Sequence, residues 1–443
     1  MNRHYYIAVL ALVALWFTGC GPRGFDVDTE LLQEKIYNPT AAKHEILGQS
    51  TVLYLDHSTC VIQARQNSRV FNAMRPQLGQ YSDTLVLIKG TNLEAIALDR
   101  SENRVFQILQ TIQHDISYAH QLKAIDRITN GNQQAILITD CEFIEQGRGN
   151  NGKDLWHDQN PFLSEPFKRW LRKGYSIYIV VEPYQERYQG KVHDKKLFYF
   201  IFTDDRLAAP ISNNMLAQIE PLRSSGLFTA FKLTNADIFV QRNGETVDRD
   251  LSFTFESLNG FDFVAIDDKW KSIREYVMKL DKYGEPIPEE SPVPLIKNYV
   301  FNEGNNYIIR DVEVVATNIT SQYMALEDSD ILSNNFDMSE GFAIDKDALR
   351  NRELRVYLTD KIFNYLNDDY GGNLIRLDFV TTAADLKPYL ADLFTWPSLF
   401  VNGEAICVSQ SIDNALRDID VVPMAKSRRI IHTVFIKTES YKP

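Results

Sequence analysis

The chain has 443 residues, of which 44% are hydrophobic and 24% are charged. This ordinary globular composition excludes a collagen, a low-complexity chain and a wholly disordered protein. A single hydrophobic core stops growing at roughly 250–300 residues, so we expect two or three domains. The formal net charge is −12. Because phosphate binding requires clustered Lys and Arg, this surplus of acids disfavours nucleic acid as a partner.

The first 19 residues have the features of an export signal. Arg3 precedes an apolar run over 5–17, and two small residues then lead to Cys20. The run is shorter than the roughly 20 residues of a bilayer span, so it predicts a cleaved signal. The small residues before Cys20 resemble the bacterial lipoprotein box, which implies that Cys20 is lipidated and anchors the protein to a membrane of the cell envelope, on its periplasmic or surface face. A plain secretory signal with an incidental cysteine is the alternative. Residues 20–47 are expected to form a tether.

Residues 48–225 are expected to form an α/β domain. Short apolar segments predict strands at 51–56, 83–89, 93–98, 134–140, 175–181 and 196–203. Helical stretches separate most of them, and a glycine in the connection at 90–92 predicts a hairpin. This alternation predicts a doubly wound, mostly parallel sheet with helices on both faces.

Acidic residues follow the predicted strands of this domain. They are Asp56, Asp140, Glu182, Asp204 and Asp205. In open α/β sheets ligands bind outside the carboxyl ends of the strands, and carboxylates are the ligands that Mg²⁺ and Ca²⁺ prefer. Strand ends that emerge into solvent also carry acids, so the spacing alone does not decide between a metal site and a solvated edge.

The order of these motifs resembles the von Willebrand factor A family. Asp56 and Ser58 follow the first strand as in the Asp-x-Ser-x-Ser motif of its metal-ion-dependent adhesion site, and Asp140 stands where the family has an Asp after the fourth strand. The resemblance implies that Mg²⁺ or Ca²⁺ is held by Asp56, Ser58, Asp140 and a hydroxyl of the middle loop, for which Ser117 is the candidate, with Thr111 behind it. It also implies that the metal completes its coordination with an acid from a protein partner, without turnover.

Two cysteines set the chain apart from this family. Cys60 occupies the third position of the first loop, where the family has Ser, and a neutral thiol is a poor ligand for a hard cation. The first and fourth strands are neighbours in the family, so the resemblance also implies that Cys60 and Cys141 lie close enough for a disulfide. An oxidising compartment would let that bond form. Two buried, reduced thiols are the alternative.

The second half of the chain is expected to be rich in β-structure. Alternating residues and turn signals predict a β-rich extension over 226–283, with a helix at 270–280, and prolines make 284–296 a linker. Six segments of alternating polar and apolar residues in 297–443 predict an antiparallel β-sandwich of the immunoglobulin-like kind. Cys407 is expected to be an inert core thiol.

Together these features predict a membrane-anchored lipoprotein that binds a protein partner through an adhesion site in which Cys60 replaces the second serine of the motif. Two alternatives stay open. One is a metal-dependent hydrolase of phosphate esters, with Asp56 and Asp140 as ligands and Ser58 or His57 in catalysis; the shortage of histidines near the strand ends and the lack of a recognised nucleophile motif count against it. The other is a structural lipoprotein of an envelope assembly, in which the site is vestigial.

Overall fold

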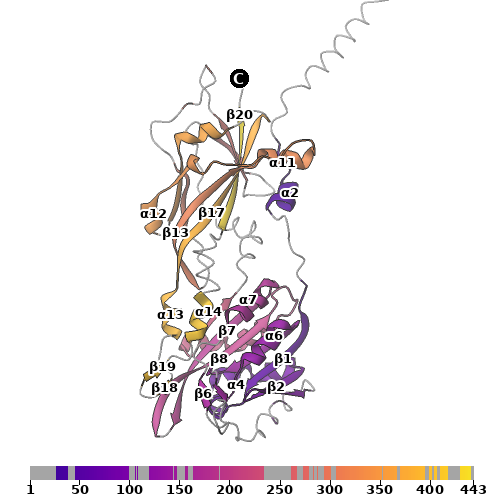
Figure 1. Ribbon diagram of the computed structural model, residues 1–443, viewed down its shortest axis with the longest axis vertical. Helices are drawn as coiled ribbons and strands as arrows, with labels where there is room; N and C mark the ends of the chain where they lie inside the picture. Colours follow the sequence, from indigo (N-terminus) through magenta and orange to yellow (C-terminus); the bar gives the residue numbers. More distant parts are fainter. Residues whose placement is uncertain are drawn as a thin grey trace, which may run out of the picture.

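The computed structural model has two lobes, one above the other in Figure 1. It describes residues 26–37, 45–98, 105, 107, 119–142, 144–146, 155–157, 163–188, 190–233, 261–266, 273–278, 283, 287, 294–300, 306–351, 353–366, 370–394, 399–401, 404–406, 410–417 and 430–440. The leader, Cys20, Ser117, Thr111 and Cys407 lie outside these ranges. Within them, no helix is long and apolar enough to cross a membrane.

The first lobe is built on a seven-stranded sheet with the order β3-β2-β1-β4-β8-β7-β9. The strands are β1 (Gly48–Asp56), β2 (Thr84–Lys89), β3 (Asn92–Ala97), β4 (Gln133–Thr139), β7 (Ser176–Tyr188), β8 (Lys191–Thr203) and β9 (Thr229–Leu233). β1 is parallel to β2 and β4, whereas the other four neighbouring pairs are antiparallel. The predicted α/β class is confirmed. The sheet is mixed, because parallel pairing joins only β2, β1 and β4.

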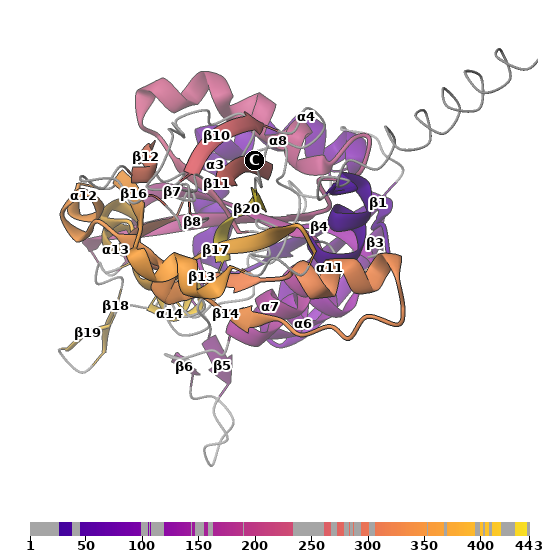
Figure 2. The same cartoon turned by 90° about the horizontal axis from the view of Figure 1, so that it is seen from above.

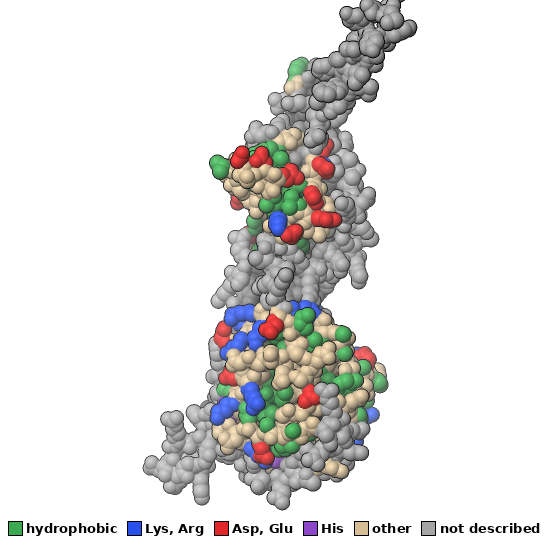
Figure 3. Space-filling model, turned by 90° about the vertical axis from the view of Figure 1, so that its right-hand side faces the viewer, with side chains coloured by type: hydrophobic (Ala, Val, Ile, Leu, Met, Phe, Trp, Pro, Cys, Tyr) green, Lys and Arg blue, Asp and Glu red, His purple; other side chains and the backbone are tan. Residues whose placement is uncertain are grey.

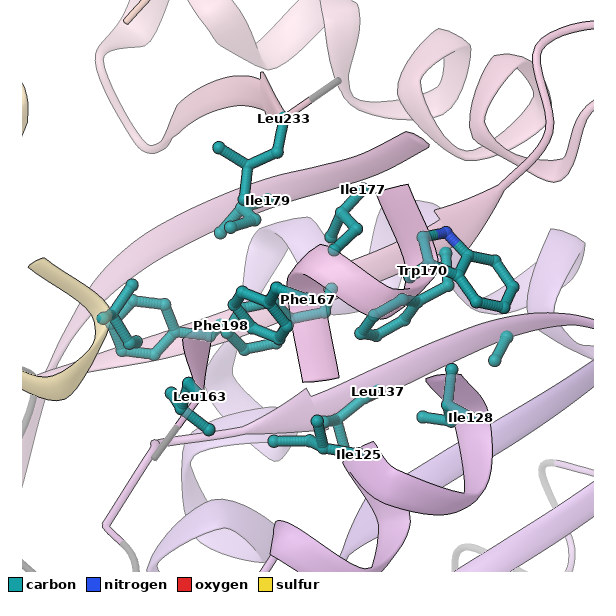
Figure 4. Close-up of a cluster of buried hydrophobic side chains, with 14 of the residues drawn as sticks. Ile125, Ile128, Leu137, Leu163, Phe167, Trp170, Ile177, Ile179, Phe198 and Leu233 are labelled. Atoms are coloured by element: carbon teal, nitrogen blue, oxygen red, sulfur yellow. The ribbon is translucent and has the colours of Figure 1, made fainter. Parts of the chain in front are cut away.

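Helices cover both faces of this sheet, as Figure 2 shows. On one side lie α3 (Thr59–Asn67), α4 (Arg69–Tyr81) and α8 (Ile211–Ile219), the last continued by η2 (Glu220–Ser225); on the other lie α6 (Leu122–Asn130) and α7 (Ser164–Arg172). Successive side chains of a strand point to opposite faces. Phe198 of β8 therefore lies in one core with Phe167 and Trp170 of α7 (Figure 4), and Phe200 packs on Phe167 in the same core. Tyr199, between them, joins the core under α4 and α8.

The hairpin of β7 and β8 extends beyond the two strands that pair with it, β4 and β9. β4 pairs with β8 only over 198–202, and β9 pairs with β7 only over 177–181. The rest of the hairpin, residues 182–197, projects beyond these neighbours, and we call it the arm. Its strands join at Gly190, whose φ of +77° suits the tight turn of a two-residue hairpin loop. The arm replaces the loop that the sequence suggested between strands at 175–181 and 196–203.

The second lobe contains a six-stranded sheet, β10-β11-β20-β17-β13-β14, and a three-stranded sheet, β12-β16-β15. Their strands are β10 (Phe261–Ile266), β11 (Ile273–Met278), β12 (Pro294–Val300), β13 (Tyr307–Asn318), β14 (Phe336–Asp337), β15 (Phe342–Ile344), β16 (Glu353–Leu358), β17 (Gly372–Leu386) and β20 (Ile430–Ser440). All pairs are antiparallel except β11 with β20. Side chains of both sheets share one core. Antiparallel sheets in this half are therefore confirmed, whereas β11 lies where a helix was expected.

Shorter elements complete the structure. They are α2 (Thr29–Leu32), η1 (Gln33–Tyr37), β5 (Ile144–Gln146), β6 (Leu155–His157), α11 (Thr320–Glu327), η3 (Ser339–Gly341), α12 (Lys346–Arg350), η4 (Asp360–Tyr365), α13 (Pro388–Phe394), β18 (Leu399–Val401), β19 (Glu404–Ile406) and α14 (Gln410–Leu416). β5 pairs with β6 and β18 with β19, each as a separate hairpin.

Two segments pack on a lobe that is built mainly from a distant part of the sequence. Leu32 and Ile36, from the stretch predicted to be a tether, are buried against Tyr323 of the second lobe, whose hydroxyl accepts a hydrogen bond of 2.7 Å from the backbone N–H of Asp28. In the other direction, α13 and α14 of the predicted sandwich segment add Leu390 and other apolar side chains to the core of the first lobe. Figure 3 shows acidic side chains on the second lobe as well as on the first.

Candidate functional site

Three of the predicted acids meet at one edge of the seven-stranded sheet. Asp56 ends β1, and Asp140 follows the parallel strand β4 at the same level. Glu182 reaches this edge from β7, which also runs in the direction of β1. Asp204 and Asp205 lie at the opposite edge, because β8 runs antiparallel to β4. The predicted acidic edge is therefore correct for the first three residues and wrong for the last two.

The carboxylate of Asp56 is fully engaged by protein donors. Its Oδ1 accepts a hydrogen bond from the backbone N–H of Ser58 (2.8 Å), and its Oδ2 accepts from Gln121 Nε2 (2.6 Å) and Thr139 Oγ1 (2.9 Å). The side chain is fully buried. Burial raises the pKa of Asp56, and these donors oppose the rise because they stabilise the ionised form. Gln121, immediately before α6, was not predicted, since no pattern in the sequence marks an isolated amide as a partner for Asp56.

Asp140 is paired with the unexpected cysteine. Cys60 Sγ donates to Asp140 Oδ2 (3.1 Å) and lies 3.3 Å from Ser58 Oγ, while the backbone N–H of Glu142 donates to Asp140 Oδ1 (3.1 Å). Burial, reinforced by the nearby Glu142, raises the pKa of Asp140 well above its usual range. Burial and the charge of Asp140 do the same to the pKa of the Cys60 thiol. A thiol in this environment stays protonated and is a weak nucleophile.

These contacts do not fit a hard divalent cation. Both oxygens of Asp56 already accept hydrogen bonds from protein donors, and the Cys60 thiol stands between Ser58 and Asp140. Across the described ranges, no three His, Cys, Asp or Glu side chains are grouped so that they could hold a metal ion. Asp56, Ser58 and Asp140, which were predicted to bind Mg²⁺ or Ca²⁺, thus lie close together. They form a hydrogen-bond network with neighbouring protein groups.

Cys60 and Cys141 are both free thiols in the structure, so the expected disulfide is not formed. β1 and β4 are neighbours, as the prediction required. However, Cys60 packs on the face covered by α3 and α4, whereas Cys141 belongs to the core under α6 and α7. Cys141 has a φ of +59°, and its N–H donates to Thr139 Oγ1. The two side chains point to opposite faces of the sheet, which explains why neighbouring strands do not bring their sulfur atoms together.

A buried ion triad links the arm to the loop after β4. Lys195 Nζ lies 2.7 Å from Glu142 Oε1 and 2.7 Å from Glu186 Oε2, and its side chain is only 8% exposed. Burial lowers the pKa of Lys195, but nearby acids, Glu142 first among them, outweigh this effect and raise the pKa above its usual range. Lys195 is therefore a permanent cation that holds two acids, and it is not a base or a nucleophile.

Glu182 has a structural role at the start of α4. Its carboxylate accepts hydrogen bonds from Ser68 Oγ and from the Tyr199 hydroxyl (3.0 Å), and Ser68 caps α4. Arg65 is buried nearby; burial lowers its pKa to about 10, against the opposing charge of Asp56. An acidic side chain at a helix N-terminus is favoured by the helix dipole, so Glu182 stabilises the start of α4 from the base of the arm.

A pocket of about 510 Å³ opens beside this network, between α3 and the arm. Cys60 and Ala64 of α3 line one side, and residues 182–187 of β7 line the other. This volume is within the range of small-ligand and side-chain sites, roughly 300–1,000 Å³. Of the network around Asp56 and Asp140, the Cys60 side chain reaches this pocket, and Glu186 of the ion triad lines its other side.

No protein family model, curated protein or solved structure matches this chain. The resemblance to the von Willebrand factor A family therefore stays a prediction from the motif residues.

We expect Asp140→Asn to stabilise the protein at pH 7, because burial beside Glu142 raises the pKa of the Asp140 carboxyl and so penalises its ionised form. The folded protein keeps a proton on Asp140 that the unfolded chain releases, so stability falls as the pH rises from about 3.8 through the raised pKa. Asn retains the acceptor for the N–H of Glu142 without this charge. Chemical denaturation of both proteins from pH 4 to 8 should show a gain near zero at pH 4 that grows with pH. A gain independent of pH, or a loss at pH 7, would contradict the assignment.

Proposed function

We propose that this protein is a lipid-anchored component of the cell envelope that binds a protein partner through the carboxyl edge of its seven-stranded sheet, without turnover. One observation carries the proposal: Asp56 and Asp140 are already hydrogen-bonded to neighbouring side chains of the protein, and a pocket opens beside them at this edge. The von Willebrand factor A family uses the same edge for adhesion, and we propose that this chain keeps the binding face while Cys60 and Gln121 replace the metal-dependent contacts.

The position of the N-terminal segment supports display of this face away from a membrane. Cys20 precedes Asp26 by six residues, which span at most about 20 Å, and α2 packs on the second lobe. The second lobe in turn meets the first at the amino edge of the sheet, where Asn306 Nδ2 donates to the carbonyl of Lys232 (2.7 Å). A lipid on Cys20 would therefore place the second lobe near the bilayer and leave the carboxyl edge on the distal side.

The chemistry of the edge supports binding over catalysis. The pKa of the Cys60 thiol is raised, the Ser58 hydroxyl is shared between that thiol and Asp56, and Lys195 is held by two carboxylates. A hydrolase needs an activated nucleophile or a metal-bound water. The thiol of Cys60 is not activated and the oxygens of Asp56 are already bonded to protein donors, so we favour partner binding over hydrolysis of phosphate esters.

Photo-crosslinking in the native membrane tests the proposal. A photoreactive amino acid at Arg187, which lines the pocket, should give a discrete crosslinked product with one protein. The control position is Asn130, an exposed residue at the end of α6 and at the opposite edge of the sheet, and it should not give this product. Crosslinks at Asn130 but not at Arg187, or none at either position, would overturn binding through the carboxyl edge.

A further inference from the structure

The N-terminal segment 26–37 packs on the lobe that comes later in the chain. It consists of α2 and η1, and the first lobe follows it in the sequence. Its buried side chains, however, share a core with residues of α11, β17 and β20, all of the second lobe. Figure 1 shows α2 beside α11 on that lobe. The segment therefore connects the start of the chain to the second lobe, and we call it the strap.

Hydrogen bonds fix the strap at the point where its helix begins. Asp28 caps α2, because its Oδ1 accepts hydrogen bonds from the backbone N–H groups of Glu30 (2.9 Å) and Leu31 (3.2 Å). The N–H of Asp28 itself donates to the hydroxyl of Tyr323, which in turn donates to Glu327 Oε1 (3.1 Å). The side chain of Tyr323 is buried in the second lobe. The cap and this hydrogen bond together define one position of the strap on α11.

Apolar side chains hold the rest of the strap in place. Leu32 and Ile36 are four residues apart, so they lie on the same side of the helical turns, and they are 0% and 4% exposed. The ring of Tyr37 meets that of Phe435 edge to face, with centroids 6.0 Å apart. A segment this short is not helical on its own in water. Burial of Leu32 and Ile36 against the second lobe is therefore what keeps the strap folded.

The order of the segments along the chain gives this contact a consequence for the anchor. Glu45, where the chain enters the first lobe, is held at the amino edge of the sheet, because its carbonyl accepts a hydrogen bond from the Tyr175 hydroxyl (3.0 Å). Without the strap, an anchor at Cys20 would be connected first to this lobe, through 25 residues that span at most about 90 Å. With the strap, only the six residues before Asp26 separate Cys20 from a segment packed on the second lobe. The strap thus changes which lobe lies next to the anchor.

We infer that the strap determines which lobe faces the membrane: it holds the second lobe at the anchor and keeps the carboxyl edge of the first lobe turned away from the bilayer. This inference rests on the proposed function, because it requires a lipid on Cys20. It adds a conformational control to that function. Loss of the strap contact leaves the first lobe as the attached one, so the strap sets where a partner can meet the carboxyl edge.

Hydrogen exchange of the full chain in phospholipid vesicles tests the strap contact. The double variant Leu32→Ser, Ile36→Ser removes the two buried side chains. Its matched control, Glu34→Ser, Lys35→Ser, changes two exposed residues of the same segment and leaves the net charge unaltered. We expect the amides of 29–37 to exchange on the order of 100-fold faster in the first variant and at the wild-type rate in the control. The strands β13 and β17 should keep their protection in both.

Energy transfer to fluorescent lipids in the same vesicles tests the orientation. A fluorescent amino acid is placed either at Leu332, which is 86% exposed in the loop after α11, or at Val192, which is 53% exposed on the arm. In the wild type and in the control variant, transfer should be strong from position 332 and weak from position 192. In Leu32→Ser, Ile36→Ser this difference should be lost, because the anchor then leads to the first lobe.

Two results would overturn the inference. One is exchange of 29–37 in the wild type as fast as in an unstructured peptide; the other is a wild-type difference in energy transfer in a variant whose strap exchanges fast. If Leu32→Ser, Ile36→Ser also loses the protection of β13, Tyr323→Phe takes its place, since it removes only the acceptor for the N–H of Asp28 and the donor to Glu327.

The mass of the N-terminal peptide separates this inference from the proposed function. If Cys20 carries no lipid, the proposed anchoring fails and the orientation fails with it, whatever the exchange of 29–37. If Cys20 is lipidated but the two double variants exchange alike, the strap fails and lipid-anchored binding stands.

Discussion

Replacing Lys195 by Met is expected to destabilise the first lobe by about 3–5 kcal/mol, the typical effect of breaking a buried ion pair by removing one partner. The loss is large because Lys195 neutralises two carboxylates at once, those of Glu142 and Glu186, each 2.7 Å from its Nζ. Both acids are largely buried, with exposed fractions of 6% and 15%. Without the lysine they remain desolvated and repel each other. The first transition in urea-induced unfolding, followed by near-UV circular dichroism, measures the effect.

Matched variants separate the charge of Lys195 from its packing. Lys195→Arg keeps the cation and should lose far less stability than Lys195→Met. The triple variant Lys195→Met, Glu142→Gln, Glu186→Gln removes all three charges and should recover most of the loss, because neutral replacements of a buried ion network are often tolerated. If Lys195→Met falls within about 1 kcal/mol of the wild type, the usual range of exposed ion pairs, then the triad is not buried in solution.

The same triad shows why the arm was missed in the sequence. Strand prediction relies on apolar alternation, but residues 182–188 and 191–195 carry mostly polar and charged side chains, because the arm has little core to cover. Because the hairpin was not recognised, β8 was not expected to run antiparallel to β7. The prediction therefore placed Asp204 at the carboxyl edge, whereas antiparallel pairing of β8 with β4 carries it to the other end. Because the turn at Gly190 was not recognised, Asp204, 14 residues further along the chain, was predicted at the wrong edge of the sheet.

The positions of Asp56 and Asp140 could be predicted because they depend only on local pattern and on one rule. Each follows a continuous apolar strand, and parallel neighbouring strands end at the same edge. Their partners could not be predicted in this way. Gln121 lies 65 residues from Asp56 in the chain, and whether its amide reaches the carboxylate depends on how α6 packs. The Cys60 thiol was recognised as a departure from the adhesion motif, but its hydrogen bond to Asp140 is a fact of tertiary structure.

Asp56→Ala is the second substitution with a large expected effect, a loss of about 3 kcal/mol or more. It leaves three buried donors without an acceptor, namely the N–H of Ser58, Nε2 of Gln121 and Oγ1 of Thr139, and a buried donor without a partner costs about 1–3 kcal/mol. Thermal and urea unfolding measure this loss. Asp204→Ala is the control, since Asp204 is equally buried at the opposite edge and ion-paired with Arg206.

The same pair of variants decides whether the edge binds metal. A ligand that binds only the folded state raises the melting temperature, and tighter binding raises it more at a given ligand concentration. Because the oxygens of Asp56 are already engaged and the Cys60 thiol occupies the position of a ligand, millimolar Mg²⁺ or Ca²⁺ should not shift the melting temperature of the wild type. A rise that is retained in Asp204→Ala and abolished in Asp56→Ala would establish a cation at this edge. That result would return the site to the metal-dependent form of adhesion that its Asp-x-Ser motif first indicated.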